Sequence, residues 1–387
     1  MRLLIAPDKF KGSLDAVDVA AALAAGWRAG WSDVLEVRTL AVADGGEGTA
    51  AAIADAVGAL WVSCAGHDAL GRPITARYAL LPQGSSPRSA IIDASDSCGL
   101  MRIEPALRDP LRASTFGTGE VLRHALVDSG ADRIVLGIGG SATNDGGSGL
   151  ARALGYAFVD ANGAEVPPGP AGLRSLARIE EPEPPCWPES CRVVVACDVR
   201  IPLLGSRGAT VLFGPQKGLT QAADRSEAEA GLQRFADVVA ATFGIDVRAV
   251  PGAGAGGGLA FGLLSLLGAR AEIRSGFDVV AEALDLEAAV AWSDLVLTGE
   301  GRLDAQSLEG KAPCSVAALA RRRGKRVVAF AGSIDVDAAP ALAAVFDELN
   351  ELRAVDPTLS QTECMARAAE LLCLCATQAA QRWSARC

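Results

Sequence analysis

Short apolar strands alternate with amphipathic helices at both ends of this 387-residue chain, and this pattern restricts the fold more than any other feature. Near the N-terminus we expect strands at 2–6, 35–42 and 60–64, separated by a helix that Ser13 caps and a helix at 49–57. Near the C-terminus we expect strands at 294–298, 326–331 and 345–347, with helices at 313–323 and 362–383. Strands that alternate with helices pair in parallel under a cover of helices.

The middle of the chain follows a different pattern. Segments 74–81 and 88–93 are expected to form a hairpin, and they are followed by elements at 120–128 (helix), 133–138 (strand), 192–197 (strand) and 223–243 (helix). A chain of this length usually folds as more than one domain. We therefore predict two α/β domains. Residues 1–65 and 286–387 form a discontinuous domain whose parallel sheet contains both chain ends, and residues 66–285 form an inserted second α/β domain.

The bulk composition excludes several classes of function. A net charge of −10 argues against nucleic acid or an anionic membrane as a partner. The charge-free segment 251–269 begins with a glycine-rich part, and its apolar part at 259–267 covers only about half of a bilayer. The first eleven residues carry four charged side chains and do not resemble a signal peptide. Ten cysteines without a Cys-x-x-Cys pair predict reduced thiols, no zinc site and a cytoplasmic protein.

Lysine is rare, and its positions are informative. The chain has 31 arginines but only five lysines, and four of these five stand beside Gly or Asp in segments without arginine: Lys9, Lys11, Lys217 and Lys311. A compact ammonium next to a glycine-rich loop suits a site that handles phosphate. The fifth lysine, Lys325, lies in a run of arginines and is interpreted as a surface residue.

Charged or glycine-rich loops directly follow five of the expected strands. They begin at Asp8, Asp44, Gly137, Asp198 and Gly299. Ligands of α/β proteins bind beyond the carboxyl ends of the strands, and glycines let backbone N–H groups approach phosphate oxygens. Carboxylates suit Mg²⁺, and one carboxylate is needed to accept the proton of a substrate hydroxyl.

These loops, together with Lys217 and Lys311, supply the candidate site residues. The metal candidates are Asp44, Glu47, Glu300 and Asp304, and the catalytic candidates are Asp8 and Asp198, as alternative bases, with Lys11. The candidates for binding substrate or phosphate are Lys9, Gly45, Gly46, Gly139, Gly140, Ser141, Asn144, Asp145, Lys217, Arg302 and Lys311. We expect the carboxylate of the substrate to pair with Lys9, Lys11 or Arg302.

Another motif points to a different enzyme class. Gly252-x-Gly254-x-x-Gly257, with Glu272 downstream, matches the dinucleotide fingerprint and would indicate an NAD(P)-dependent dehydrogenase of a small hydroxy acid. The pattern is weak, because a glycine- and alanine-rich run satisfies it easily. A P-loop is absent, since Gly310-Lys311 is followed by Ala312. A catalytically silent sensor would carry a basic DNA-binding module, which this acidic chain lacks.

Taken together, eight blocks in chain order resemble the bacterial glycerate kinase family of the sugar-diacid degradation type. They are Ala6–Ser13, Ala43–Thr49, Asp68–Pro73, Gly117–Glu120, Gly137–Gly147, Phe213–Gly218, Pro251–Gly254 and Thr298–Asp304. The resemblance implies a flavodoxin-like domain, a second α/β domain and ATP-dependent phosphorylation of D-glycerate with Mg²⁺. It favours 2-phosphoglycerate as the product, with 3-phosphoglycerate as the alternative, and leaves monomer and homodimer open.

One block departs from the family pattern. Where the family usually continues from Asp198-Val199 to Asn-Pro-Leu, this chain has Arg200-Ile201-Pro202-Leu203. If the family amide touches ligand, this chain has lost that contact or has replaced it with Arg200. The departure weakens the assignment of Asp198 relative to Asp8, Asp44 and Glu300.

Overall fold

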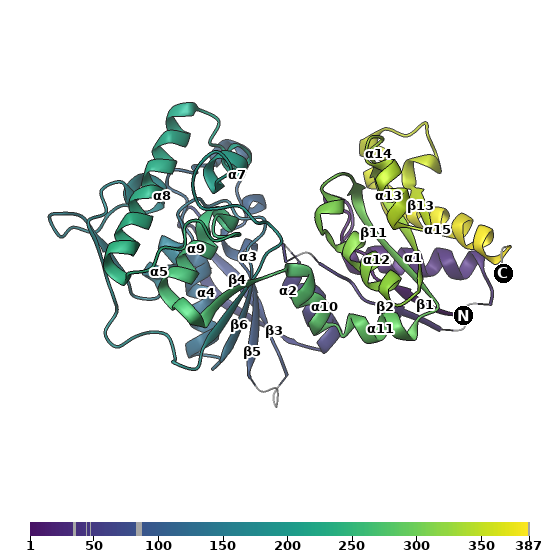
Figure 1. Ribbon diagram of the computed structural model, residues 1–387, viewed down its shortest axis with the longest axis horizontal. Coiled ribbons are helices and arrows are strands. Elements are labelled where there is room, and N and C mark those ends of the chain that lie inside the picture. Colours follow the sequence, from purple (N-terminus) through teal and green to yellow (C-terminus); the bar gives the residue numbers. More distant parts are fainter. Residues whose placement is uncertain (34–35, 44, 47, 83–86, 386–387) are drawn as a thin grey trace. The chain divides into compact units, whose positions relative to one another are not determined.

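The computed structural model describes residues 1–33, 36–43, 45–46, 48–82 and 87–385 (Figure 1). The chain divides into two units, a terminal unit of residues 1–44 and 277–387 and a central unit of residues 45–276. Among the residues described, we find no helix with the length and apolar character that a membrane span requires.

The terminal unit contains a parallel sheet to which both ends of the chain contribute. Its described strands are β1 (Arg2–Ile5), β2 (Glu36–Thr39), β11 (Leu295–Leu303), β12 (Arg326–Ile334) and β13 (Glu348–Glu351). They are ordered β2-β1-β11-β12-β13, and every neighbouring pair is parallel. Numbered within this sheet, the order is 2-1-3-4-5, that of flavodoxin-like folds. The predicted fold class is confirmed.

Helices cover both faces of this sheet. α1 (Ala16–Gly30) and α15 (Ala368–Ser384) pack on each other and share a core with alternate residues of the strands, such as Leu3 and Ile5. α11 (Leu286–Trp292) and α12 (Ala312–Arg322) contact the strands outside that core and cover the other face. The remaining helical segments are α10 (Gly276–Ala283), α13 (Ala339–Val345), α14 (Gln361–Ala366), η4 (Ser307–Glu309) and η5 (Leu352–Ala354).

Two helices begin or divide at other residues than expected, because N-cap residues set where each helix starts. Asp15, not Ser13, caps α1, since its Oδ1 accepts from the Asp18 amide at 2.8 Å. The Ser13 hydroxyl instead donates to the Phe10 carbonyl at 3.0 Å and closes the preceding turn. The single helix expected at 362–383 is two helices. α14 begins with a capping box between Ser360 and Glu363, and α15 follows after Arg367.

The central unit contains a mixed sheet in the order β10-β9-β6-β5-β4-β3. Its described strands are β3 (Leu60–His67), β4 (Pro73–Leu80), β5 (Ser89–Asp93), β6 (Arg133–Gly137), β9 (Arg192–Ala196) and β10 (Ala271–Arg274). β5, β6, β9 and β10 are parallel, whereas β3 and β4 are antiparallel to their neighbours. The expected hairpin is confirmed, because Leu80 pairs with Ala90 across β4 and β5. β7 (Ala157–Val159) and β8 (Arg178–Glu180) form a separate antiparallel pair.

The strand at 60–64 was expected in the parallel sheet of the terminal domain, and this expectation is wrong. β3 pairs antiparallel with β4 at the edge of the central sheet. Only five residues connect β3 to β4, and a parallel crossover needs a dozen or more. The helix expected at 49–57 forms as α2 (Thr49–Val57), but it also belongs to the central unit. The boundaries between the units along the chain therefore fall after residues 44 and 276, not after residues 65 and 285.

The other helices of the central unit surround an apolar core. They are α3 (Ser95–Cys98), α4 (Phe116–Val127), α5 (Ser148–Ala153), α6 (Gly169–Leu173), α7 (Ala209–Lys217), α8 (Ala222–Phe243), α9 (Ala255–Leu267), η1 (Leu100–Arg102), η2 (Pro105–Leu107) and η3 (Gly268–Arg270). Phe235 of α8 lies 5.5 Å from Phe158 of β7 and 5.4 Å from Phe261 of α9, between ring centroids. These rings tie α8, α9 and the small β7–β8 pair into one core.

Candidate active site

In the terminal unit, the loop after β1 lies beside the carboxyl-terminal half of β11. The Asp8 amide donates to the Gly299 carbonyl at 2.8 Å, and the Thr298 hydroxyl donates to the Ala6 carbonyl at 2.7 Å. Gly301 contacts the backbone of the same loop, because a Cβ atom there would lie 3.1 Å from the Lys11 nitrogen. The parallel pairing of β1 and β11 thus brings two of the loops chosen from the sequence together.

Carboxylates and one ammonium cluster at the end of β11. The Lys311 Nζ lies 3.5 Å from Glu300 Oε2 and 3.7 Å from Asp304 Oδ1. Ser307, which the sequence did not single out, donates its hydroxyl to Glu300 Oε1 at 2.5 Å. Burial raises the pKa of Glu300, and the Ser307 hydroxyl and the Lys311 ammonium oppose that shift. The arrangement concentrates negative charge around a single lysine.

The other terminal-unit candidates differ in exposure. Asp8 is buried, and its Oδ1 accepts from the Lys9 amide at 2.7 Å. Lys9 is partly exposed and Lys11 is exposed. The Arg302 guanidinium is held by two carboxylates, Asp335 Oδ2 at 2.9 Å and Asp304 Oδ2 at 3.6 Å. Asp44 lies outside the described residues, as does Glu47 of the central unit.

In the central unit, Lys217 supports the glycine-rich loop that follows β6. This buried residue ends α7, and its Nζ donates to the Thr143 carbonyl at 2.6 Å and to Ser141 Oγ at 3.2 Å. Burial lowers the pKa of Lys217 to about 8, an effect that the charge of Asp145 opposes. The ammonium therefore acts on the backbone and hydroxyl of the loop itself.

Asn144 and Asp145 lie inside the central unit. Asn144 is fully buried and donates to Thr210 Oγ1 at 3.1 Å, and its Oδ1 has no hydrogen-bond partner among the residues described. The Asp145 carboxylate, also fully buried, accepts hydrogen bonds from the Thr115 amide and hydroxyl and from the amides of Gly147 and Gly149. Asp145 thus joins the start of α4 to the start of α5, which is a role in building the loop.

Gly139, Gly140, Gly45 and Gly46 lie on two loops of the central unit. Gly140 is exposed, and its carbonyl accepts from the Leu100 amide at 2.8 Å. The Gly46 carbonyl accepts from the Thr49 hydroxyl at 2.8 Å, directly before α2. Gly139 and Gly46 are partly exposed, whereas Gly45 is buried, so each loop reaches the surface at one glycine or more.

Asp93 is a candidate that the sequence analysis missed. It ends β5, and its carboxylate accepts from the Gly48 amide at 3.0 Å and the Ala50 amide at 3.2 Å at the start of α2. Asp198 has a similar place after β9, where its Oδ1 accepts from the Gly276 amide at 3.0 Å. An acid directly after an apolar strand was the signal that identified Asp198, and Ile91-Ile92-Asp93 carries the same signal.

The dinucleotide interpretation of residues 252–257 is not supported. The fingerprint requires a strand before its first glycine, whereas these residues follow α8 and an irregular segment. Gly257 has a φ of 72°, and a Cβ atom there would lie 2.0 Å from the Thr143 carbonyl oxygen. This glycine serves the close packing of α9 on the loop that follows β6.

Ile201, at the departure from the family pattern, is part of the apolar core. Its side chain is buried, and its carbonyl accepts from the amides of Gly252 and Gly254 at 3.0 and 3.1 Å. The backbone at this position therefore anchors the Gly252–Gly254 turn. Arg200 beside it is exposed.

The comparisons with known proteins agree with this picture. Residues 3–384 match the model of the glycerate kinase family. The chain is 41% identical over 338 residues to the glycerate kinase of Bacillus subtilis (strain 168), covering 87% of this chain and 86% of that protein. It is 42% identical over 341 residues to the glycerate 2-kinase of Escherichia coli (strain K12), with 87% and 86% covered. A crystal structure of a Salmonella typhimurium LT2 protein described as a glycerate kinase 2 superposes with a TM-score of 0.83 at 39% identity, covering 100% of this chain and 99% of that one. The chain therefore belongs to the glycerate kinase family and is a kinase.

Proposed function

We propose that this kinase transfers the terminal phosphoryl group of ATP to D-glycerate and forms 2-phosphoglycerate. The observation that carries the proposal is the Glu300–Lys311–Asp304 cluster beside the Asp8–Lys11 loop, at the carboxyl ends of parallel strands. The choice of the 2-position follows the 42% identity to the Escherichia coli glycerate 2-kinase.

The reaction needs a base and positive charge. The substrate hydroxyl oxygen forms a bond to the terminal phosphorus, the bond from that phosphorus to the bridging oxygen of ADP breaks, and the hydroxyl proton passes to a base. Asp8 is our first choice for the base, because this buried carboxylate lies in the loop that carries Lys9 and Lys11; Asp198 is the alternative. The two ammonium groups offset charge on the transferred group and on the substrate carboxylate.

The residues present fit a magnesium ion. Mg²⁺ is usually held by one or two carboxylates together with phosphate oxygens and water. The described residues contain no group of three or more possible metal ligands, but Glu300 and Asp304 supply a carboxylate pair. When bound there, the ion would offset negative charge on the phosphate oxygens. The Lys311 ammonium already lies near both carboxylates. When the ion is bound, this ammonium would either turn toward the phosphates or share the two carboxylates with the ion.

The central unit is proposed to supply backbone groups for phosphate. Gly46, Gly139 and Gly140 are at least partly exposed, so their N–H groups can approach phosphate oxygens, and the buried Gly45 shapes the loop beside Gly46. Ser141 is held in its loop by the buried Lys217. We assign Lys217, Asn144 and Asp145 to the support of these loops, because all three side chains are buried.

Direct chromatographic measurement of ADP, without coupling enzymes, tests the reaction. Purified protein with ATP and Mg²⁺ is expected to release ADP only when D-glycerate is present, and the release should stop when the metal is chelated. No change in NADH absorbance is expected with glycerate or related hydroxy acids. ADP release that does not depend on D-glycerate, or a glycerate-dependent NADH signal, would contradict the proposed function.

A further inference from the structure

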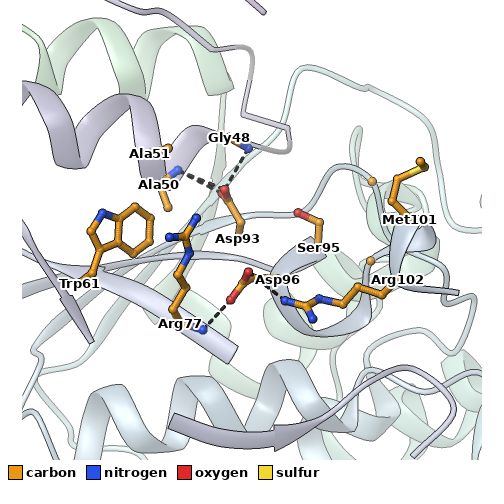
Figure 2. Close-up of a pocket in the computed structure, with 12 residues that line it drawn as sticks. Gly48, Ala50, Ala51, Trp61, Arg77, Asp93, Ser95, Asp96, Met101 and Arg102 are labelled. Carbon is orange, nitrogen blue, oxygen red and sulfur yellow. Dashed lines mark hydrogen bonds and ion pairs between the residues drawn. The ribbon is translucent and has the colours of Figure 1, made fainter. Parts of the chain in front are cut away.

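A pocket of about 390 Å³ opens on the central unit (Figure 2). Gly48 at the start of α2 and Gly140 of the loop after β6 both line it, so it adjoins two of the glycine loops. β3, β4 and β5 contribute Trp61, Arg77 and Asp93. The volume lies within the range of roughly 300–1,000 Å³ typical of small-ligand sites.

Arg77 is held in one place on the wall of this pocket. Its guanidinium carbon lies 4.3 Å from the ring centroid of Trp61, on the neighbouring strand of the β3–β4 pair. The Arg77 amide donates to Asp96 Oδ2 at 2.5 Å, and this hydrogen bond fixes the backbone at Arg77. Figure 2 shows the guanidinium beside the indole and facing the side of the pocket where Asp93 lies. A stacked guanidinium loses little further freedom when it binds a ligand.

Among the residues described, the charged side chains around the pocket have other partners than this guanidinium. Asp96 is engaged by Arg102, whose Nη2 lies 3.1 Å from Asp96 Oδ1, and by the Arg77 amide. Asp93 accepts from the amides at the start of α2. Within the described part of the chain, no side chain forms an ion pair or hydrogen bond with the guanidinium of Arg77.

We propose that Arg77 binds an oxyanion in this pocket, either the carboxylate of the acid substrate or a phosphate of the nucleotide. The planar N–H groups of arginine match two oxygens of either group. In a chain with a net charge of −10, an anionic ligand needs such a local cation. The inference deepens the proposed function and rests on it. It adds a specificity-determining residue that no motif in the sequence indicated.

The test compares two stacked arginines. Arg77→Gln and Arg77→Lys remove or alter the proposed contact. Arg38→Gln is the matched control, because Arg38 stacks on Trp292 at 4.0 Å in the terminal unit, outside the pocket. We expect Arg77→Gln to raise KM for one substrate at least about tenfold, the loss typical of one charge-assisted hydrogen bond, with kcat changed by less than about twofold. Arg77→Lys should recover only part of this loss, and Arg38→Gln should match the wild type.

The two arms of the assay identify the oxyanion. A higher KM for glycerate alone indicates the carboxylate, and a higher KM for ATP alone indicates a phosphate. Calorimetric titration with glycerate, ATP and inorganic phosphate measures binding without turnover, and melting temperatures confirm that each variant is folded. If the wild type does not phosphorylate glycerate but Arg77→Gln still weakens binding of ATP or phosphate, the proposed substrate is wrong and this inference stands. Equal KM values and equal affinities in wild type, Arg77→Gln and Arg38→Gln would overturn it.

Discussion

At the scale of single residues, the cluster at the end of β11 combines features that oppose each other. Glu300 is buried, which raises its pKa, yet it accepts a hydrogen bond from Ser307 and faces the Lys311 ammonium. Burying a charged carboxylate costs folding stability, even when an ammonium group lies beside it. Perturbed carboxylates with a specific partner are enriched at functional sites.

Glu300→Gln is expected to lower kcat/KM at least about a hundredfold, because an interaction with charge in the transition state is lost. The change keeps the size of the side chain, so the melting temperature should shift only slightly. Glu287→Gln is the control, since Glu287 pairs with Arg323 at the surface of the same unit. Near-normal turnover in Glu300→Gln would remove this residue from the site.

Lys217 predicts a pH dependence of stability. Its folded-state pKa of about 8 lies below the ordinary lysine value of 10.5, so between these values the unfolded chain binds more protons and the free energy of unfolding rises with pH. Relative to Lys217→Met, the wild type should gain on the order of 2 kcal/mol between pH 7 and pH 9.5, measured by urea unfolding. Lys325→Met is the control. It also removes a lysine that donates to a backbone carbonyl, that of Ser293 at 2.6 Å. A difference that is constant with pH would contradict the assignment.

At the scale of elements, close contact of two helices holds the terminal unit together. α1 and α15 come from opposite ends of the chain and approach so closely that a Cβ atom on Gly26 would lie 2.2 Å from the Cys373 carbonyl oxygen. The Thr377 hydroxyl also donates to the Gly26 carbonyl at 3.1 Å. Interiors with this packing density have little room for an added methyl group.

Gly26→Ala should therefore reduce the free energy of unfolding by about 1–3 kcal/mol, even though alanine favours helices over glycine. Ala25→Ser, at an exposed position of the same turn, is the control and should change stability by less than about 0.5 kcal/mol. Thermal unfolding of both variants measures the difference. A more stable Gly26→Ala protein would show that the helices can separate without cost.

The sequence predicted most elements of this chain, and the exceptions have local causes. The helix at 49–57 and the strands that became β6, β9 and β12 were placed within a few residues, because their apolar periodicity is strong. β3 was assigned to the wrong sheet, since periodicity does not reveal the partner of a strand and the short connection to β4 was overlooked. Ser307 was missed because a lone serine has no motif, and only the fold brings it to Glu300. Asp93 was overlooked although it ends an apolar strand, the signal that identified Asp198.

At the scale of the whole molecule, both units follow the same rule. Each presents acidic or glycine-rich loops at the carboxyl ends of parallel strands, around β1 and β11 in one unit and β5, β6 and β9 in the other. The sequence predicted the two-domain α/β class because this alternation is visible in it. It did not predict the boundary at residue 44, because this depends on which sheet β3 joins.

Phosphorus NMR of the product is the most direct measurement of the central claim that this chain is a kinase of D-glycerate. Purified protein is incubated with ATP, Mg²⁺ and D-glycerate, and the proton coupling of the new resonance identifies the phosphorylated carbon. A phosphate on the C2 oxygen couples to one proton and gives a doublet, whereas one on the C3 oxygen couples to two protons and gives a triplet. We predict the doublet of 2-phosphoglycerate. A triplet would contradict the proposed position, and no new phosphate ester would contradict the claim itself.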